Sequence, residues 1–402
     1  LVIDRLSALM LALLAAIALP VVRYASAGWD THGKHFHALF QFQLMGLAGA
    51  FATGDLFNLF VFFEVLLIAS YCLLLHGLGK ERLRAGIHYV VLNLAASALF
   101  LIGVSLLYSV TGTLNMADLA LRVAALSEAD APVARSAALI LLVVFGLKAA
   151  IVPLHMWLPS TYAAAAAPTA ALFAIMTKVG VYAIVRVHVA IFGADAGAAA
   201  LAAAPLLLPI ALLTGVLGVV GALAARTFSG MIAYLTISSV GTILTGVGLF
   251  SETGLGAALF YLVHSTLVVA ALFLLAEVVA AQRGDAADRL EPAAPVAQPA
   301  VLGTVLVLGA MSVAGAPPLT GFIGKIMLLE SARDTAAVAW VWATLLVTSL
   351  LGLIGMARAG SIVFWQVRPE AAAGFDAGHS NRLLLQPLLL LAPVIRITVF
   401  AA

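Results

Sequence analysis

The sequence has little charge and almost no cysteine. Only 9% of its 402 residues are charged and 64% are hydrophobic, whereas roughly a quarter of the residues in an ordinary soluble domain are charged. This composition excludes a soluble fold, because no soluble core needs so much apolar surface. The single cysteine, Cys72, lies in an apolar stretch. One chain can therefore build neither a disulfide framework nor a cysteine metal site, and we expect no metal and no cofactor.

Two motifs of energy-converting proteins are also missing. The sequence has no cysteine cluster for an iron–sulfur centre and no G-x-x-x-x-G-K-[ST] phosphate loop. We therefore expect a transporter component and not an enzyme, with energy supplied by an ion gradient or by partner subunits. The net charge of +2 does not predict nucleic-acid binding, because the basic residues lie in loops between apolar runs, where they act as topology signals.

Long apolar runs predict twelve transmembrane helices, since each crossing needs about 20 mostly apolar residues. The tenth run is too long for one straight helix, and the breaks between runs leave no room for a soluble domain. The predicted spans lie near residues 4–22, 36–53, 56–77, 87–110, 136–157, 165–190, 204–225, 229–250, 255–280, 298–330, 337–357 and 383–400.

The orientation follows from the distribution of lysine and arginine. Eleven of these residues lie in loops after odd-numbered spans and three in loops after even-numbered spans. Because cytoplasmic loops carry the excess of positive charge, the first set is predicted to be cytoplasmic. The loops 281–297 and 358–382 then lie inside, and Leu1 starts on the outer side.

Two segments resemble interrupted helices, each with a lysine close to proline. They read FGLKAAIVPLHMWLP from Phe145 to Pro159 and GAPPLTGFIGKIMLL from Gly315 to Leu329. Pro153, Pro317 and Pro318 free carbonyls that need partners in protein or water, and we expect a hydrated cavity beside them. His155 could line that cavity or bond a freed carbonyl. Broken helices in corresponding halves, here 36–190 and 204–357, are typical of inverted-repeat transporters.

Five ionisable residues lie well inside apolar stretches. They are Glu64, Lys148, Lys178, His264 and Lys325. A charge at mid-membrane costs at least ~2.5–3.5 kcal/mol on insertion scales, so each needs an explanation. One explanation is a proton relay in which Glu64 partners Lys148, and the proton passes to Lys178, His264 and Lys325. The alternative is a fixed Glu64–Lys148 ion pair with the other lysines reaching an interface. Three spaced lysines and a histidine favour transport.

Four segments carry a family resemblance that extends over nearly the whole chain. They resemble the D subunits of Mrp-type multisubunit cation/proton antiporters, whose fold is shared with the antiporter-like subunits of respiratory complex I. The segments are TGDLFNLFVFFEVLLIASYCLLLHG, GLKAAIVPLHMWLPSTYAAAAAPTAALFAIMTKVGVYAI, YLVHSTLVVAALFLL and GAPPLTGFIGKIMLL.

The resemblance implies an all-α, polytopic membrane helix bundle with two five-helix inverted repeats and broken helices. The fold has fourteen helices, and this chain is expected to begin at the third. The implied division is a leading transmembrane helix and loop, a first five-helix repeat, a second five-helix repeat, and a cytoplasmic loop with the last transmembrane helix. These parts are expected at residues 1–35, 36–203, 204–357 and 358–402.

The resemblance also gives each ionisable residue a place. Glu64 matches the glutamate of the fifth family helix, Lys148 the lysine of the broken seventh and Lys178 that of the eighth. His264 matches the histidine of the eleventh helix, and Lys325 the terminal lysine of the broken twelfth. Many relatives carry a further lysine shortly after that histidine, where this chain has STLVVAALF. The relay between Lys178 and Lys325 is therefore expected to use hydroxyls and water.

Together these features predict a proton-translocating subunit of a Na⁺/H⁺ or K⁺/H⁺ antiporter in the bacterial inner membrane. It would work with other subunits of a hetero-oligomer and bind no nucleic acid. The alternative is a proton-pumping subunit of complex I or of a membrane-bound hydrogenase. Complex I subunits typically carry a histidine where this chain has Tyr162, which favours the antiporter branch. A structural scaffold with inert ion pairs is a third possibility.

Overall fold

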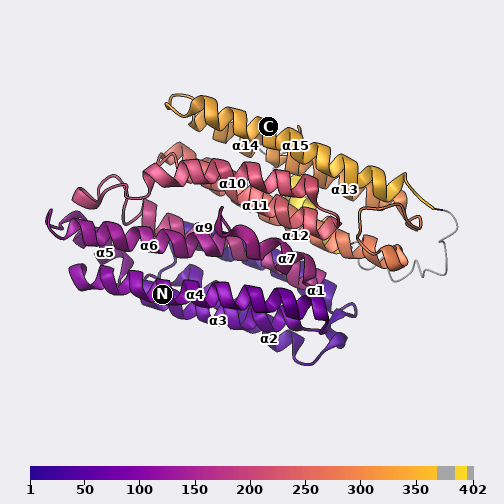
Figure 1. Cartoon of the computed structure of the whole chain (residues 1–402), viewed down its shortest axis with the longest axis horizontal. Coiled ribbons are helices and arrows are strands. Elements are labelled where there is room, and N and C mark those ends of the chain that lie inside the picture. Colours follow the sequence, from indigo (N-terminus) through magenta and orange to yellow (C-terminus); the bar gives the residue numbers. More distant parts are fainter. Residues whose placement is uncertain (369–384, 396–402) are drawn as a thin grey trace.

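The computed structural model describes residues 1–368 and 385–395, which form a bundle of long helices lying side by side (Figure 1). The helices are α1 (Arg5–Ala25), α2 (Phe36–Ala52), α3 (Leu56–Leu75), α4 (Lys80–Thr111), α5 (Met116–Ala124), α6 (Ala131–Ala149), α7 (Trp157–Ala164), α8 (Ala167–Phe173), α9 (Met176–Ile184), α10 (Ala204–Ala224), α11 (Phe228–Val247), α12 (Glu252–Gln282), α13 (Pro299–Ala314), α14 (Thr320–Ser331) and α15 (Val338–Phe364). A further apolar helix covers Leu385–Ile395.

The predicted spans agree with these helices. Within the described residues, nine helical segments are long and apolar enough to cross a membrane, and three shorter apolar helices lie within the predicted spans at 36–53, 298–330 and 383–400. The last of these spans, and most of the predicted loop 358–382, extend outside the described residues. The amphipathic helix α5 was not predicted; it lies in the loop after α4 and buries only Leu119 and Val123.

The helices follow one another across the bundle. In Figure 1, α2–α4 lie at one edge, α6, α7 and α9 beside them, α10–α12 next, and α13–α15 at the opposite edge. Burial shows where the centre lies. In the most apolar stretches of Ala167–Val189 and Phe228–Val247, 94% of the residues are buried, whereas in that of Val338–Phe364 only 28% are buried. The centre is therefore formed by α8, α9, α11 and the similarly enclosed α12.

Glycine allows the central helices to approach closely. A Cβ atom at Gly180 of α9 would lie 2.5 Å from the backbone nitrogen of Ala149 at the end of α6. At Gly241 of α11 it would lie 2.3 Å from the backbone nitrogen of Gly215 of α10. Small residues let membrane helices pack backbone to backbone, and here they bring the helix that carries Lys178 against the end of the helix that carries Lys148.

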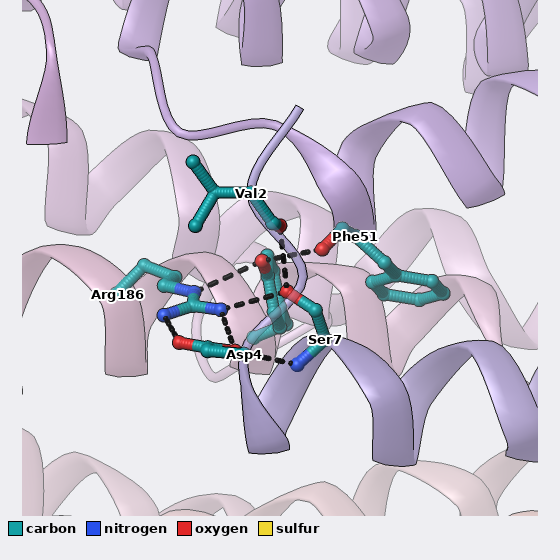
Figure 2. A network of polar contacts seen from close by, with 6 residues as sticks. Val2, Asp4, Ser7, Phe51 and Arg186 are labelled. Carbon is teal, nitrogen blue, oxygen red and sulfur yellow. Dashed lines mark hydrogen bonds and ion pairs between the residues drawn. The ribbon is translucent and has the colours of Figure 1, made fainter.

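A polar network ties α1 to the first half of the bundle (Figure 2). Asp4 caps α1 by accepting a bond from the Ser7 nitrogen (2.8 Å), and it forms a forked ion pair with Arg186. The Arg186 Nε also donates to the Tyr182 hydroxyl (2.9 Å), which donates to the Phe51 carbonyl (2.9 Å). Arg186 lies in a π-helical segment, Val185–Val189. Its guanidinium holds the pKa of the Asp4 carboxyl well below its usual range.

Replacing Asp4 with asparagine should lower the free energy of unfolding at pH 7 by about 1 kcal/mol, because a charge-assisted bond is lost at a partly exposed site. The lowered pKa means that Asp4 stabilises the fold fully above the pKa of unfolded aspartate, about 3.9. This stabilisation is lost as the pH falls toward the folded-state pKa. Thermal unfolding in detergent at neutral and acid pH measures the difference.

Asp118→Asn is the matched control, because it breaks an exposed pair with Arg122 within α5 (Nε–Oδ1 3.4 Å). An exposed pair of this kind contributes at most about 0.5 kcal/mol. Equal unfolding temperatures for the two variants at pH 7 would contradict the role given to Asp4.

Candidate ion-translocation site

Lys148 lies at the end of α6, where the helix stops at Ala149. Its side chain is buried, with 8% exposed. The Nζ donates to Asn93 Oδ1 on α4 (3.2 Å) and lies 5.8 Å from the centre of the Phe63 ring on α3. The ammonium is therefore surrounded by an amide oxygen and an aromatic face, both of which favour a cation.

Glu64 lies on α3 and is only half-buried. Its Oε1 is hydrogen-bonded to the Ser97 hydroxyl of α4, whose oxygen also lies 3.0 Å from the Asn93 carbonyl. Of the ion pairs among the described residues, none joins Glu64 to Lys148. The fixed ion pair of the alternative interpretation is not seen in this structure. Instead, the two groups are joined by a bridge on α4, in which Ser97 holds the carboxylate and Asn93 holds the ammonium.

The bridge belongs to a row of polar side chains on one face of α4. Tyr89, Asn93 and Ser97 follow one another at four-residue spacing, which places them on the same side of a helix. Asn93 Nδ2 donates to the Tyr89 carbonyl (2.9 Å), and the Tyr89 hydroxyl lies 2.9 Å from the Ser70 hydroxyl of α3. We did not predict this row, although three polar residues at helical spacing in an apolar helix are a usable signal.

Lys178 lies on α9 and is completely buried. Its Nζ donates to the Ser239 hydroxyl of α11 (3.3 Å), and Ser239 donates to the Thr236 carbonyl (2.7 Å). In the described part of the chain, no ion pair joins Lys178 to a carboxylate. Its polar contact therefore leads toward the second half of the bundle.

His264 lies on α12 with both ring nitrogens in contact with the broken helix α13–α14. Nδ1 lies 2.7 Å from the Thr320 hydroxyl, and Nε2 lies 3.1 Å from the Ser312 carbonyl. A carbonyl only accepts, so Nε2 carries a hydrogen. The close approach requires Gly321, where a Cβ would lie 2.7 Å from Nε2.

Lys325 lies on α14 with 9% of its surface exposed. Its Nζ donates to the carbonyls of Val313 (2.7 Å) and Ala314 (3.1 Å), which end α13, and to the Ser349 hydroxyl of α15 (2.7 Å). The break in this helix therefore provides the oxygens that hold the lysine.

Two small cavities accompany these groups. One of about 30 Å³ is lined by Ser239, His264 and Lys325, and by the hydroxyls of Ser238, Thr242, Ser265 and Thr348. It can hold about two waters, since one water needs roughly 10–15 Å³. The other, of about 10 Å³, adjoins Lys148, Asn93, Tyr89 and Trp157. It is also lined by Met176 and Val179, which flank Lys178 on α9, but not by Lys178 itself.

The helix breaks obtain their hydrogen-bond partners from side chains. Trp157 Nε1 donates to the Leu147 carbonyl (3.0 Å), and the Val152 nitrogen donates to the Thr214 hydroxyl (3.1 Å). Lys325 serves the carbonyls of the second break. These bonds reduce the need for the hydrated cavity that we expected beside the prolines.

The prolines of the two breaks face outward. Pro153, Pro317 and Pro318 are exposed on the surface of the chain, and His155 is half-buried. None of these four residues lines the cavities beside the three lysines. Their predicted place along the ion path stays a prediction.

Comparisons with known proteins identify relatives of this chain. Residues 53–353 match the family described as NADH:quinone oxidoreductase/Mrp antiporter, TM. A relative from Rhizobium meliloti, named as the D subunit of a probable K(+)/H(+) antiporter, is 47% identical over 91% of this chain and 73% of its own length. The D subunit of a Na(+)/H(+) antiporter from Bacillus subtilis is 39% identical over the same shares.

Two solved structures share the fold along almost the whole chain. A chain of the Mrp complex from Dietzia sp. superposes with a TM-score of 0.86 at 29% identity, covering 99% of this chain and 81% of that one. A chain of respiratory complex I from Thermus thermophilus with bound NADH superposes with a TM-score of 0.83 at 27% identity, covering 98% and 82%.

The breaks beside Lys148 and Lys325, the apolar spans and these likenesses lead to one conclusion. The chain belongs to the family of NADH:quinone oxidoreductase and Mrp antiporter membrane subunits, and it is a multi-pass protein of the bacterial inner membrane.

Proposed function

We propose that this chain is the proton-translocating subunit of a multisubunit antiporter that exchanges protons for Na⁺ or K⁺. The observation that carries the proposal is the series of buried ionisable groups through the centre of the bundle. Lys148, Lys178, His264 and Lys325 are each at most 9% exposed. Intramembrane ionisable groups that are retained at such cost typically mark a proton or ion path.

The first part of the relay joins Glu64 to Lys148 through α4. Asn93 Oδ1 holds the ammonium, and the Ser97 hydroxyl, which also bonds the Asn93 backbone carbonyl, holds the carboxylate, so groups of α4 set the separation of the two charges. A small shift of α4 relative to α3 or α6 changes this separation, and with it the energy of the charged lysine, because the attraction between opposite charges is strong in a poorly polarisable interior. The pair thereby favours protonation of Lys148 when close and proton release when apart.

The second part of the relay runs from Lys178 to Lys325. Ser239 bonds Lys178 and lines the same cavity as His264 and Lys325, so waters in that cavity complete the connection. His264 suits the middle position, since the Thr320 hydroxyl can donate to a neutral ring or accept from a charged one. The step between Lys148 and Lys178 uses water that enters the smaller cavity as the helices move.

The division into repeats fits this sequence of steps. The first predicted repeat, 36–203, holds Glu64, Lys148 and Lys178, and the second, 204–357, holds His264 and Lys325. Each repeat then contributes one broken helix with a lysine beside its break. The protein would act with the other subunits of the assembly, since its relatives are named as antiporter subunits. Those names include both K⁺ and Na⁺, so the exchanged cation is one of these two.

A second candidate is a proton-pumping subunit of a redox complex, and the likeness to the chain of complex I favours it. Tyr162, buried with its hydroxyl bonded to the Phe173 carbonyl (2.7 Å), stands where complex I subunits typically carry histidine. Purification of the native assembly distinguishes the candidates: flavin or iron–sulfur subunits in it would favour the redox complex.

The proposal predicts that Lys148→Ala and Glu64→Ala abolish cation-driven proton movement. In everted vesicles that hold the whole assembly, added Na⁺ or K⁺ should release protons from wild type, as followed with a pH-sensitive dye. Each variant should lose most of this release at unchanged expression, because the first protonation site or its charge partner is missing.

Lys80→Ala is the control, because Lys80 is an exposed residue at the start of α4. It should exchange as wild type does. Intact exchange by Lys148→Ala in a normally assembled complex would overturn the proposal, and proton pumping driven by an electron donor without a cation response would support the redox candidate.

The bridge on α4 gives a separate prediction. Asn93→Leu removes the oxygen that holds the Lys148 ammonium, and a hydrogen bond to a charged group contributes about 1.5–3 kcal/mol. The initial rate of exchange should therefore fall about tenfold or more. Ser109→Ala, which removes an exposed hydroxyl from the same helix, should leave the rate unchanged. Similar rates for the two variants would show that Asn93 has no part in the relay.

A further inference from the structure

A large polar hollow opens at the end of the bundle that the lysine and arginine bias predicts to be cytoplasmic. It has a volume of about 760 Å³ and lies between α4, α7 and the loops before α11 and after α12. Charged and hydroxyl side chains line it, among them Glu81, Arg84, His88, Ser160 and Asp288. A hollow of this size and polarity fills with water.

Two pairs of consecutive residues separate this hollow from the cavity of Lys148. On α4, His88 lines the hollow and Tyr89 lines the cavity. At the start of α7, Met156 lines the hollow and Trp157 lines the cavity. The Tyr89 and Trp157 rings stack on each other, with centroids 4.9 Å apart and planes at 23°. The stacked pair therefore lines the Lys148 cavity at the two places where the chain continues directly to the hollow.

Both rings are held in place. Trp157 is 2% exposed and donates from Nε1 to the Leu147 carbonyl, next to Lys148 (3.0 Å). Tyr89 is 1% exposed and its hydroxyl lies 2.9 Å from the Ser70 hydroxyl. The Asn93 amide that partners Lys148 also bonds the Tyr89 carbonyl (2.9 Å). A movement of the lysine-bearing end of α6 is thus transmitted directly to the Trp157 ring, and through Asn93 to the Tyr89 backbone.

We propose that the Tyr89–Trp157 stack is a gate that closes the Lys148 cavity toward the polar hollow and opens to let water reach the lysine. This inference rests on the proposed function of Lys148 as a proton carrier. A proton needs a chain of waters or hydroxyls to move, and stacked rings interrupt such a chain. The closed cavity of about 10 Å³ has room for about one water, so delivery of a proton from the hollow requires the rings to part.

Access of a small thiol reagent to the Lys148 cavity tests the gate without relying on transport. Val179 lines this cavity and is 2% exposed, so Val179→Cys places a thiol there in a Cys72→Ser background. The whole assembly is kept in everted vesicles and treated with silver ion, which is similar in size to the transported cations. Thiols that remain free are then labelled with a maleimide after denaturation, on the separated chain.

With the native rings, the introduced thiol should react slowly with silver. Trp157→Leu should speed the reaction at least tenfold, and Tyr89→Leu should do the same. Two variants are used so that the test still works if one of them fails to assemble. Trp157→Phe keeps the stack and should preserve most of the protection. Trp340→Leu, a change at an exposed tryptophan of α15, is the control and should not alter the rate.

Fast reaction with the native rings, or unchanged protection in both leucine variants, would overturn the gate. Faster reaction in right-side-out than in everted vesicles would overturn its cytoplasmic direction. The outcome is independent of the exchange assay. If the rings protect the thiol but Lys148→Ala still exchanges, only the proposed function is refuted. If Lys148→Ala loses exchange but the rings do not protect the thiol, only this inference is refuted.

Discussion

The cost of placing amines inside a membrane is the constraint on which this structure depends. Each of Lys148, Lys178 and Lys325 would cost at least ~2.5–3.5 kcal/mol if left unpartnered at mid-membrane. Each Nζ donates to one or more oxygens of the bundle. The acceptor is an amide oxygen at Lys148, a hydroxyl at Lys178, and two carbonyls and a hydroxyl at Lys325. None of these partners is a carboxylate, so each amine is held without being locked into its charged form.

This choice of partners explains which helices lie at the centre. A neutral oxygen must approach closely to stabilise an ammonium, so the helices that supply the oxygens must pack tightly around those that supply the amines. Gly180 lets α9 touch the end of α6, and Gly241 lets α11 touch α10. Ser238, Ser239 and Thr242 of α11 then line the cavity that reaches His264 and Lys325.

The sequence predicts those features whose signal is local. A charge in an apolar run is visible without knowing any contact, which is why Lys148, Lys178, His264 and Lys325 could be singled out and are indeed found buried. The long spans and the two interrupted helices are equally local. By contrast, Lys148 and Asn93 are 55 residues apart, and Lys178 and Ser239 are 61 apart, so only the packing of helices reveals these partners.

The direct Glu64–Lys148 contact was expected because opposite charges in neighbouring spans attract. In this structure Glu64 bonds Ser97 and Lys148 bonds Asn93, both on α4, and the partnership of Glu64 with Lys148 in a relay stays a prediction. Arg186 shows the same limitation, because it pairs with Asp4, 182 residues away, and lies in the π-helical segment Val185–Val189. A helical wheel drawn from the sequence places no residue on a π turn correctly.

The outward position of the three prolines affects how many unbonded amide hydrogens a broken helix exposes at its surface. An ordinary residue at an exposed break carries an amide hydrogen that needs an acceptor, and lipid offers none. Proline has no such hydrogen, so Pro153, Pro317 and Pro318 present only ring carbons and an acceptor oxygen at the exposed side of each break. Replacing them would therefore add an amide hydrogen at the surface of each break. The prolines therefore interrupt the helices and also reduce the number of exposed amide hydrogens at the breaks.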